Sequence, residues 1–133
     1  MYLIDTNVLS ELPKKKPEPA VLRWFGSLSS ISVSSISIEE LTFGVERARG
    51  TQKDFLREWL SRLLATKPRI VDITTHVTIA AGRLRALRHD KGKPVAQADM
   101  LIAACALEAG LVLATRNTRD FEGCGVALFN PFD

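Results

Sequence analysis

The sequence predicts an α/β domain built on a central, mostly parallel sheet of five strands. Short segments of β-favouring apolar residues alternate along the chain with longer segments whose apolar residues recur at helical spacing. The first strand, residues 2–4, is apolar without polar alternation, which is typical of a central strand buried on both faces. Asp5 follows it directly, and ligands of such sheets bind beyond the carboxyl ends of the strands. We therefore expect the functional site at this edge.

Length and composition predict a single soluble domain spanning residues 1–133. The chain is long enough to bury a core without disulfides or metal staples. Its net charge of +3 fits a nucleic-acid partner without requiring one. No apolar segment reaches the ~18 residues of a membrane span, and the start has neither a basic lead nor a signal core. The two cysteines lack CxxC spacing, and Cys105 lies in an apolar helical segment. Together these features predict a cytoplasmic protein with no membrane partner.

Two helices are expected directly after the first strand. A short one covers residues 6–12, because Thr and Asn cap helices and Pro13 stops this one. Residues 13–19 hold three lysines and three prolines and are predicted to form an exposed loop. Pro19 suits the first turn of the second helix. The residues expected on its buried side are Val21, Leu22, Trp24 and Phe25.

The middle of the chain predicts a strand followed by two helices. The strand lies at residues 31–33, where apolar residues alternate with serine. A helix over residues 37–49 is expected to end at Gly50. The next helix, from residue 52 to about 64, carries an apolar face at helical period. That face consists of Phe55, Leu56, Trp59, Leu60, Leu63 and Leu64.

The last part of the chain supplies three more strands and two more helices. The strands are predicted at residues 70–73, 111–114 and 126–129. The first helix covers residues 75–89, and the second runs from 95 to 109 and ends at Gly110. The residues expected on the buried face of the first helix are Val77, Ala80, Ala81, Leu84 and Leu87.

Asp99 is the most informative single residue. It lies in a helix that is apolar almost all round and therefore predicted to be buried. No basic residue stands three or four positions away from it. A buried, unpaired carboxylate is costly, so it is usually paired at long range or bound to a metal. We interpret Asp99 as a functional acid, with a distant salt bridge as the alternative.

Glu40 and Asp5 each have a structural explanation as well as a functional one. Ser37 and Glu40 form the capping-box pattern S-x-x-E, which alone explains Glu40. Asp5 can be a simple helix cap. However, both follow predicted strands, so both are placed near the carboxyl edge of the sheet.

Asn117 and Asp120 follow the fourth strand and are placed at the same edge, although either suits a turn. Oxygen ligands without histidine or cysteine favour Mg²⁺ or Mn²⁺. The only histidines, His76 and His89, are thirteen residues apart in one predicted helix, so zinc is disfavoured. The sequence thus predicts a magnesium site with Mn²⁺ as a possible substitute.

Four segments carry a resemblance to a known family. They are Leu3-Ile4-Asp5-Thr6-Asn7, Ser37-Ile38-Glu39-Glu40-Leu41-Thr42-Phe43-Gly44, Ala98-Asp99-Met100-Leu101-Ile102-Ala103, and Ala114-Thr115-Arg116-Asn117 with Asp120-Phe121. The ending Phe129-Asn130-Pro131-Phe132 also fits. In this order and spacing, which span almost the whole chain, they resemble PIN-domain ribonucleases, and among these the VapC-type toxins of bacterial toxin–antitoxin pairs.

The resemblance implies a three-layer α/β/α domain with sheet order 3-2-1-4-5. It maps the family's acids onto Asp5, Glu40 and Asp99, with Leu41 and Gly44 fixing the register of Glu40. The family's fourth acid falls at Asn117, a neutral departure for which Asp120 is a candidate compensation. It further implies Mg²⁺-dependent endonucleolytic cleavage of RNA, homodimers, and inhibition by a cognate antitoxin.

In this interpretation Asp5, Asp99 and Glu40 hold the metal, and Asn117 contacts a metal-bound water. The hydroxyls of Thr6 and Thr115 are candidates for hydrogen bonds that orient the metal ligands. Arg116 and Arg119 are candidates for contacts to RNA phosphates. Two alternatives stay open. One is a signalling receiver module that binds Mg²⁺, although no lysine follows the last strand and only Asp5 follows the first. The other is a PIN domain that binds RNA without cleaving it.

Overall fold

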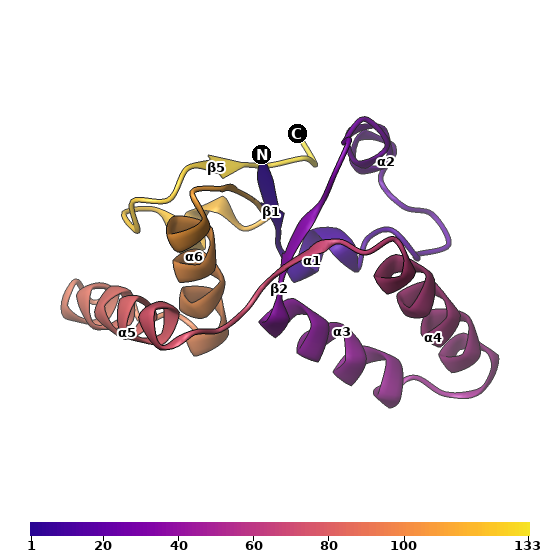
Figure 1. The fold of residues 1–133 in the computed structure, drawn as a ribbon, viewed down its shortest axis with the longest axis horizontal. Helices are drawn as coiled ribbons and strands as arrows, with labels where there is room; N and C mark the ends of the chain where they lie inside the picture. The colour runs from indigo at the N-terminus through magenta and orange to yellow at the C-terminus, as the bar shows by residue number, and fades with distance from the viewer.

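A computed structural model describes all residues, 1–133, and contains one five-stranded sheet. Two groups of helices flank this sheet (Figure 1). The strands are β1 (Tyr2–Ile4), β2 (Ser32–Ser34), β3 (Arg69–Val71), β4 (Val112–Ala114) and β5 (Leu128–Phe129). Their order is β3-β2-β1-β4-β5, and every neighbouring pair is parallel. The predicted fold class and strand order are therefore confirmed.

The helices cover both faces of the sheet. They are α1 (Thr6–Leu9), α2 (Pro19–Gly26), α3 (Ser35–Arg47), α4 (Gly50–Ala65), α5 (Thr75–Asp90), α6 (Gln97–Ala109) and the short 3₁₀ helix η1 (Thr118–Phe121). In Figure 1, α5 and α6 lie on one side of β1, and α1 to α4 lie on the other. Consecutive residues of β1 accordingly enter different cores: Leu3 packs with α5 and α6, and Ile4 packs with α1 to α4. β1 is thus buried on both faces, as its apolar composition predicts.

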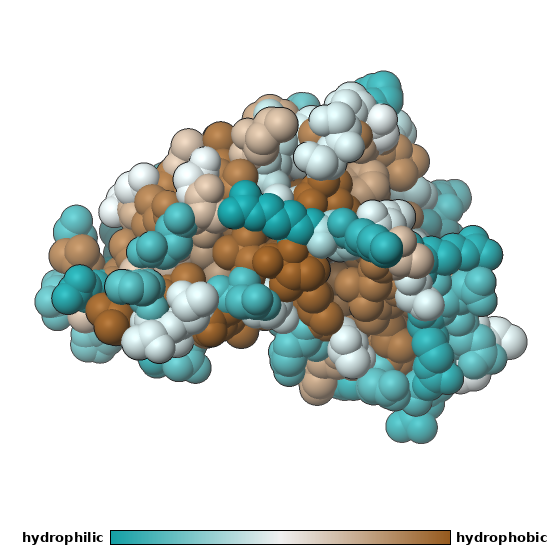
Figure 2. All heavy atoms as spheres, in the orientation of Figure 1, coloured by the Kyte–Doolittle hydropathy of each residue, from teal (hydrophilic) through white to brown (hydrophobic).

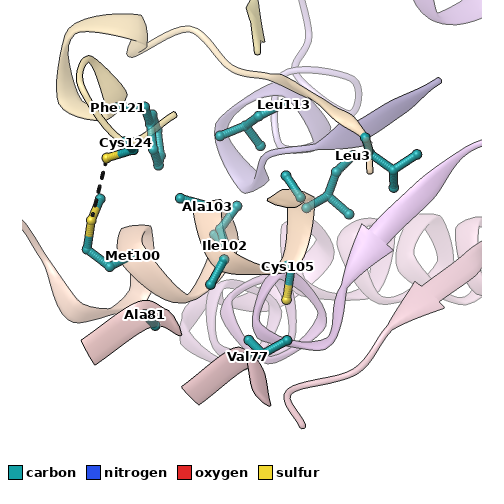
Figure 3. Close-up of a cluster of buried hydrophobic side chains, with 13 residues drawn as sticks. Leu3, Val77, Ala81, Met100, Ile102, Ala103, Cys105, Leu113, Phe121 and Cys124 are labelled. Atoms are coloured by element: carbon teal, nitrogen blue, oxygen red, sulfur yellow. Dashed lines mark hydrogen bonds between the residues drawn. The ribbon is translucent and has the colours of Figure 1, made fainter. Parts of the chain in front are cut away.

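The core beneath α5 and α6 takes six of its 13 buried residues from α6. Figure 3 shows Ala103 of α6 on the side of Leu113 and Phe121, Met100 beside Cys124, and Ile102 and Cys105 nearer to Val77 of α5. The alanines of α6 let the helix approach the sheet closely, and Cys105 is fully buried. This packing fixes α6 against β4, and with it the position of Asp99 in the first turn of α6.

Some element boundaries differ from those predicted. α1 ends at Leu9 rather than residue 12, and the chain continues as a turn. α3 begins at Ser35 and ends at Arg47, because Ala48 is extended. Gly50 does not end α3 but begins α4, in a left-handed conformation with φ of 60°. Gly110 does end α6 as predicted, with φ of 67°.

Four apolar residues expected on buried helix faces are on the surface. Leu22 is 44% exposed, Phe55 58%, Leu64 38% and Leu87 53%. Each lies on a helix that packs against the protein on one side only. The apolar stripe of the helix is wider than the part that the neighbouring elements bury.

The serines of β2 are polar residues that are buried. Ser32 and Ser34 are buried, and Ser34 Oγ caps the N–H of Ile36 and contacts Cys105 Sγ.

Candidate active site

Asp5 lies at the carboxyl end of the central strand and is held there by two hydrogen bonds. It is the N-cap of α1, and its Oδ1 accepts from the Thr6 backbone N–H at 2.7 Å. Its Oδ2 accepts from Thr115 Oγ1 at 2.8 Å, just beyond the end of β4. The side chain is only 4% exposed. Asp5 is therefore both a helix cap and a fixed, buried carboxylate between two parallel strands.

Glu40 reaches the same edge from the second turn of α3. Its Oε1 lies 2.6 Å from Thr6 Oγ1, which in turn lies 2.9 Å from Ser37 Oγ. The threonine has a single hydroxyl hydrogen and the carboxylate can only accept, so Thr6 donates to Glu40 and Ser37 donates to Thr6. The capping-box explanation of Glu40 is wrong, because Ser34 caps α3 and Ser37 lies inside the helix. Ser37 instead fixes the hydroxyl that orients Glu40.

Asp99 is half-buried in the first turn of α6, where the helix dipole favours a negative charge. The chain has four ion pairs, and none includes Asp99, Asp5 or Glu40. The alternative of a distant salt bridge for Asp99 is thus absent from the structure. All three carboxylates stand without a cationic partner.

The carboxylates lie close enough to act on one another electrostatically. Burial, reinforced by the charges of Asp99 and Glu40, raises the pKa of Asp5 to about 6, although its two hydrogen bonds oppose the rise. Burial also raises the pKa of Asp99, with further contributions from the charges of Asp120 and then Glu40. This is the electrostatic pattern of a site that gains stability by binding a cation.

The residues after β4 divide into two groups. Asn117 is exposed, and its side chain forms no hydrogen bond. Its backbone N–H donates to Thr115 Oγ1 at 3.1 Å, and its carbonyl accepts from the Asp120 N–H at 3.0 Å. Asp120, in η1, is the acid whose charge acts most strongly on Asp99. The role predicted for the Asn117 side chain stays a prediction, and Asp120 supplies a nearby negative charge. The exposed Arg116 guanidinium stacks over the Phe132 ring at 4.4 Å.

Sequence reasoning missed two residues that organise this region. Asn7 bridges the ends of β1 and β4: its Oδ1 accepts from the Arg116 N–H at 3.2 Å, and its Nδ2 lies 3.4 Å from Thr115 Oγ1. Glu11 is 6% exposed and accepts from Lys14 Nζ at 2.8 Å and from the Glu18 N–H at 2.9 Å. These bonds fix the loop at residues 13–18. The Glu11–Lys14 spacing was the only sequence signal for it.

The side chains at the site offer the type of ligand atom that Mg²⁺ prefers. Asp5, Glu40 and Asp99 offer hard carboxylate oxygens, and both histidines are exposed on α5 away from any cluster. No three aspartate, glutamate, histidine or cysteine side chains are close enough together to enclose an ion by themselves. Mg²⁺ does not need such a cage, because it retains several waters and binds through one or two carboxylates plus substrate phosphates.

A cleft of about 1030 Å³ opens beside the site, with Thr6 and Glu40 in its wall. One side is apolar and comes from α3 and α4: Leu41, Val45, Phe55, Leu56 and Trp59. Basic residues line another part: Lys14, Lys15 and Arg49. Two of the three lysines of the predicted exposed loop thus border the cleft. Figure 2 shows hydrophobic surface in the middle of the view, with hydrophilic residues around it.

The parallel sheet of order 3-2-1-4-5, covered by helices on both faces and with acidic side chains at its carboxyl edge, defines a three-layer α/β domain. The family profile described as "PIN domain" matches residues 2–124, and the chain belongs to the PIN-domain family. It is similar to the plasmid stability protein StbB of Pseudomonas syringae pv. tomato, with 36% identity over 100% of this chain and 99% of that protein. It is also 35% identical to toxin FitB of Neisseria gonorrhoeae, over 99% of both chains.

Another relative, the VapC ribonuclease Y4jK of Sinorhizobium fredii, is 33% identical over 100% of this chain and 99% of the relative. Among solved structures, FitAcB from Neisseria gonorrhoeae matches with a TM-score of 0.91 and 35% identity, over 99% of both chains. DNA-bound VapBC from Salmonella typhimurium matches with a TM-score of 0.83 and 30% identity, over 98% of this chain and 97% of that one. Family membership sets aside the receiver-module alternative. None of the helices combines the length and apolar character needed to cross a bilayer.

Proposed function

We propose that this chain is a Mg²⁺-dependent endoribonuclease. The observation that carries the proposal is the set of three carboxylates without cationic partners, gathered around the buried Asp5. The names of the relatives support it, because several are ribonucleases or endonucleases of the VapC type. When bound, Mg²⁺ lowers the pKa of a coordinated water and stabilises charge on the phosphoryl oxygens. Mn²⁺ is expected to substitute for it.

The side chains have distinct roles in this proposal. Asp5 and Asp99 hold the ion, directly or through water. Glu40, oriented by Thr6, binds a second ion or positions the attacking water and accepts its proton. Thr115 and the Thr6 N–H keep the Asp5 carboxylate in its orientation. The Asn117 side chain would contact a water bound to the ion. Arg119 would contact a phosphate of the RNA.

The test is cleavage of RNA by the purified protein in Mg²⁺, in Mn²⁺ and in EDTA. We expect cleavage with either ion and none in EDTA. Asp5→Asn and Asp99→Asn are expected to lose activity, whereas the matched control Asp54→Asn, on the exposed face of α4, retains it. Cleavage that persists in EDTA would overturn the metal mechanism. RNA binding without cleavage by the parent would instead support the binding-only PIN domain.

We further propose that the chain is the toxin of a type II toxin–antitoxin pair, held in check by a cognate antitoxin in the cytoplasm. FitB is a toxin, and VapBC and FitAcB are the solved complexes that this chain resembles. The apolar and basic walls of the large cleft suit a segment of such a partner. Expression is expected to inhibit growth, and co-expression of a cognate antitoxin is expected to restore it. Toxicity that is undiminished in Asp99→Asn would contradict the proposal.

We also propose a homodimer, which the family resemblance implies. Sedimentation equilibrium of the purified protein is expected to give twice the chain mass of 14.7 kDa. A single species at the chain mass would contradict it.

A further inference from the structure

A second, smaller cavity lies on the α5–α6 side of the molecule. Its volume is about 170 Å³, and it sits between the C-terminal end of α5 and the loop that follows η1. Three cationic side chains line it, namely Arg88, Lys91 and Lys93, together with the single carboxylate residue Glu122. The cavity is therefore strongly basic for its size.

Arg88 is the unusual member of this group. It is only 9% exposed, yet it forms no ion pair with any carboxylate. Its Nη1 donates to the Glu122 carbonyl oxygen, while its buried Nε has no hydrogen-bond partner. Lys91 and Lys93 likewise take part in no ion pair. A buried guanidinium without a counter-charge is costly, and an anion in the cavity would offset that cost.

The segments that line the cavity lead to the carboxylate site. Glu122 lies two residues after Asp120, whose charge acts on Asp99, and Lys93 precedes Asp99 by six residues. Cys124, which lines the cavity, has its Sγ 3.9 Å from the Sδ of Met100, as Figure 3 shows. Met100 follows Asp99 directly in α6, and η1 packs against the same helix. A cluster of carboxylates repels the phosphates of RNA, so a strand that crosses it needs cations close by.

We propose that this basic cavity binds a backbone phosphate of the RNA strand, next to the bond that the carboxylate site cleaves. The inference rests on the proposed ribonuclease function and adds a substrate subsite to it. A guanidinium suits a phosphate because its planar fork donates two parallel hydrogen bonds. Such a contact positions the strand and reads no sequence.

The test removes the two exposed lysines and leaves Arg88, whose bond to the Glu122 carbonyl holds the loop. In Lys91→Gln/Lys93→Gln we expect the KM for a short single-stranded RNA to rise about tenfold at ~100 mM salt, with kcat within about twofold of the parent. The matched control, Arg83→Gln/Arg85→Gln, removes the same charge from exposed positions of α5 outside the cavity. Its KM is expected to stay within about twofold.

Inorganic phosphate provides a second, independent probe. In EDTA and at constant ionic strength, phosphate is expected to raise the melting temperature of the parent and the control but not of Lys91→Gln/Lys93→Gln. A KM that is unchanged, or that rises equally in the control, overturns the subsite while the ribonuclease function stands. A phosphate effect without a KM effect marks a site for free anions and overturns the RNA assignment. If the parent cleaves no RNA, the proposed function fails, and the phosphate result alone reports on the cavity.

Discussion

Thr6 connects two carboxylates that the chain places 35 positions apart. Its backbone N–H donates to Asp5, and its hydroxyl donates to Glu40. The hydroxyl leaves Glu40 with its second oxygen free at the edge of the cleft. Thr6 therefore fixes the relative position of the two acids without being a ligand itself.

Thr6→Val removes the hydroxyl and keeps the shape of the side chain. We expect RNA cleavage to fall about 10- to 100-fold, because Glu40 loses the bond that orients it. Thr6→Ser retains the hydroxyl and is expected to keep most of the activity. Single-turnover cleavage rates of the three proteins check this. A valine variant as active as the parent, or a serine variant that loses as much activity as the valine variant, would contradict this role of the hydroxyl.

The pKa of Asp5 predicts a pH-dependent stability of the metal-free protein. Because burial raises this pKa to about 6, the folded protein favours the protonated carboxyl. The stabilisation is fully present below the unfolded-state pKa near 4 and is lost as pH rises through 6. A shift of two units corresponds to about 3 kcal/mol at most.

Denaturant unfolding in EDTA at pH 4 and pH 7 measures this effect. From the lower to the higher pH, the parent is expected to lose about 2–3 kcal/mol of unfolding free energy relative to Asp5→Asn, which cannot titrate. The comparison cancels the titration of the groups that do not interact with Asp5. A difference between the two proteins that is the same at both pH values would contradict the assignment.

The end of α4 contains the only non-glycine residue with positive φ. Lys67 follows the C-cap Thr66 and has φ of 56°, and its N–H donates to the Leu64 carbonyl at 3.0 Å. Glycine normally takes this position because a Cβ is strained there. The strain is tolerated because the chain must turn at once from α4 into β3.

Lys67→Gly is therefore expected to stabilise the fold by about 0.5–1 kcal/mol, since the relief of strain exceeds the extra entropy of the unfolded chain. Melting curves should show a rise of roughly 2–4 °C. Lys67→Ala, which removes the same charge but keeps the Cβ, is the control and should bring no such gain. A similar rise in the alanine variant would mean that the lysine charge, and not the backbone, is unfavourable.

Across the fold, the carboxylate site opposes the stability of the metal-free protein. Burial and then the charges of Asp120 and Glu40 raise the pKa of Asp99, so ionised Asp99 is destabilising without a cation. Asp99→Asn keeps the shape and removes one charge. In EDTA we expect it to melt a few degrees above the parent.

Metal should reverse that order. With a millimolar dissociation constant, ~10 mM Mg²⁺ adds about 1.4 kcal/mol to the parent, and the variant gains less because it lacks a ligand. Four melting curves, with and without Mg²⁺ for each protein, check both halves of the prediction. If Asp99→Asn melts below the parent in EDTA, Asp99 has a structural role instead.

The sequence alone determined the sheet, its central strand and the edge that carries the acids. Residues 2–4 are apolar at every position, and a strand of this kind is stable only when both faces are covered, as the two cores around Leu3 and Ile4 show. Asp5 and Asp99 were identifiable for a local reason. Each is a carboxylate next to apolar residues with no basic neighbour in sequence.

Only the tertiary structure decided how the side chains meet. Which serine caps α3 depended on where β2 ends, and the local S-x-x-E pattern indicated the wrong one. The bond between Thr6 and Glu40 joins positions 34 apart, and that between Thr115 and Asp5 joins positions 110 apart. The basic cavity around Arg88 likewise forms from two distant segments. Local sequence patterns reflect the conformational preferences of residues within a turn or two of one another. The contacts of Thr6 with Glu40 and of Thr115 with Asp5 exist because parallel pairing brings the ends of β1, β2 and β4 to one edge of the sheet.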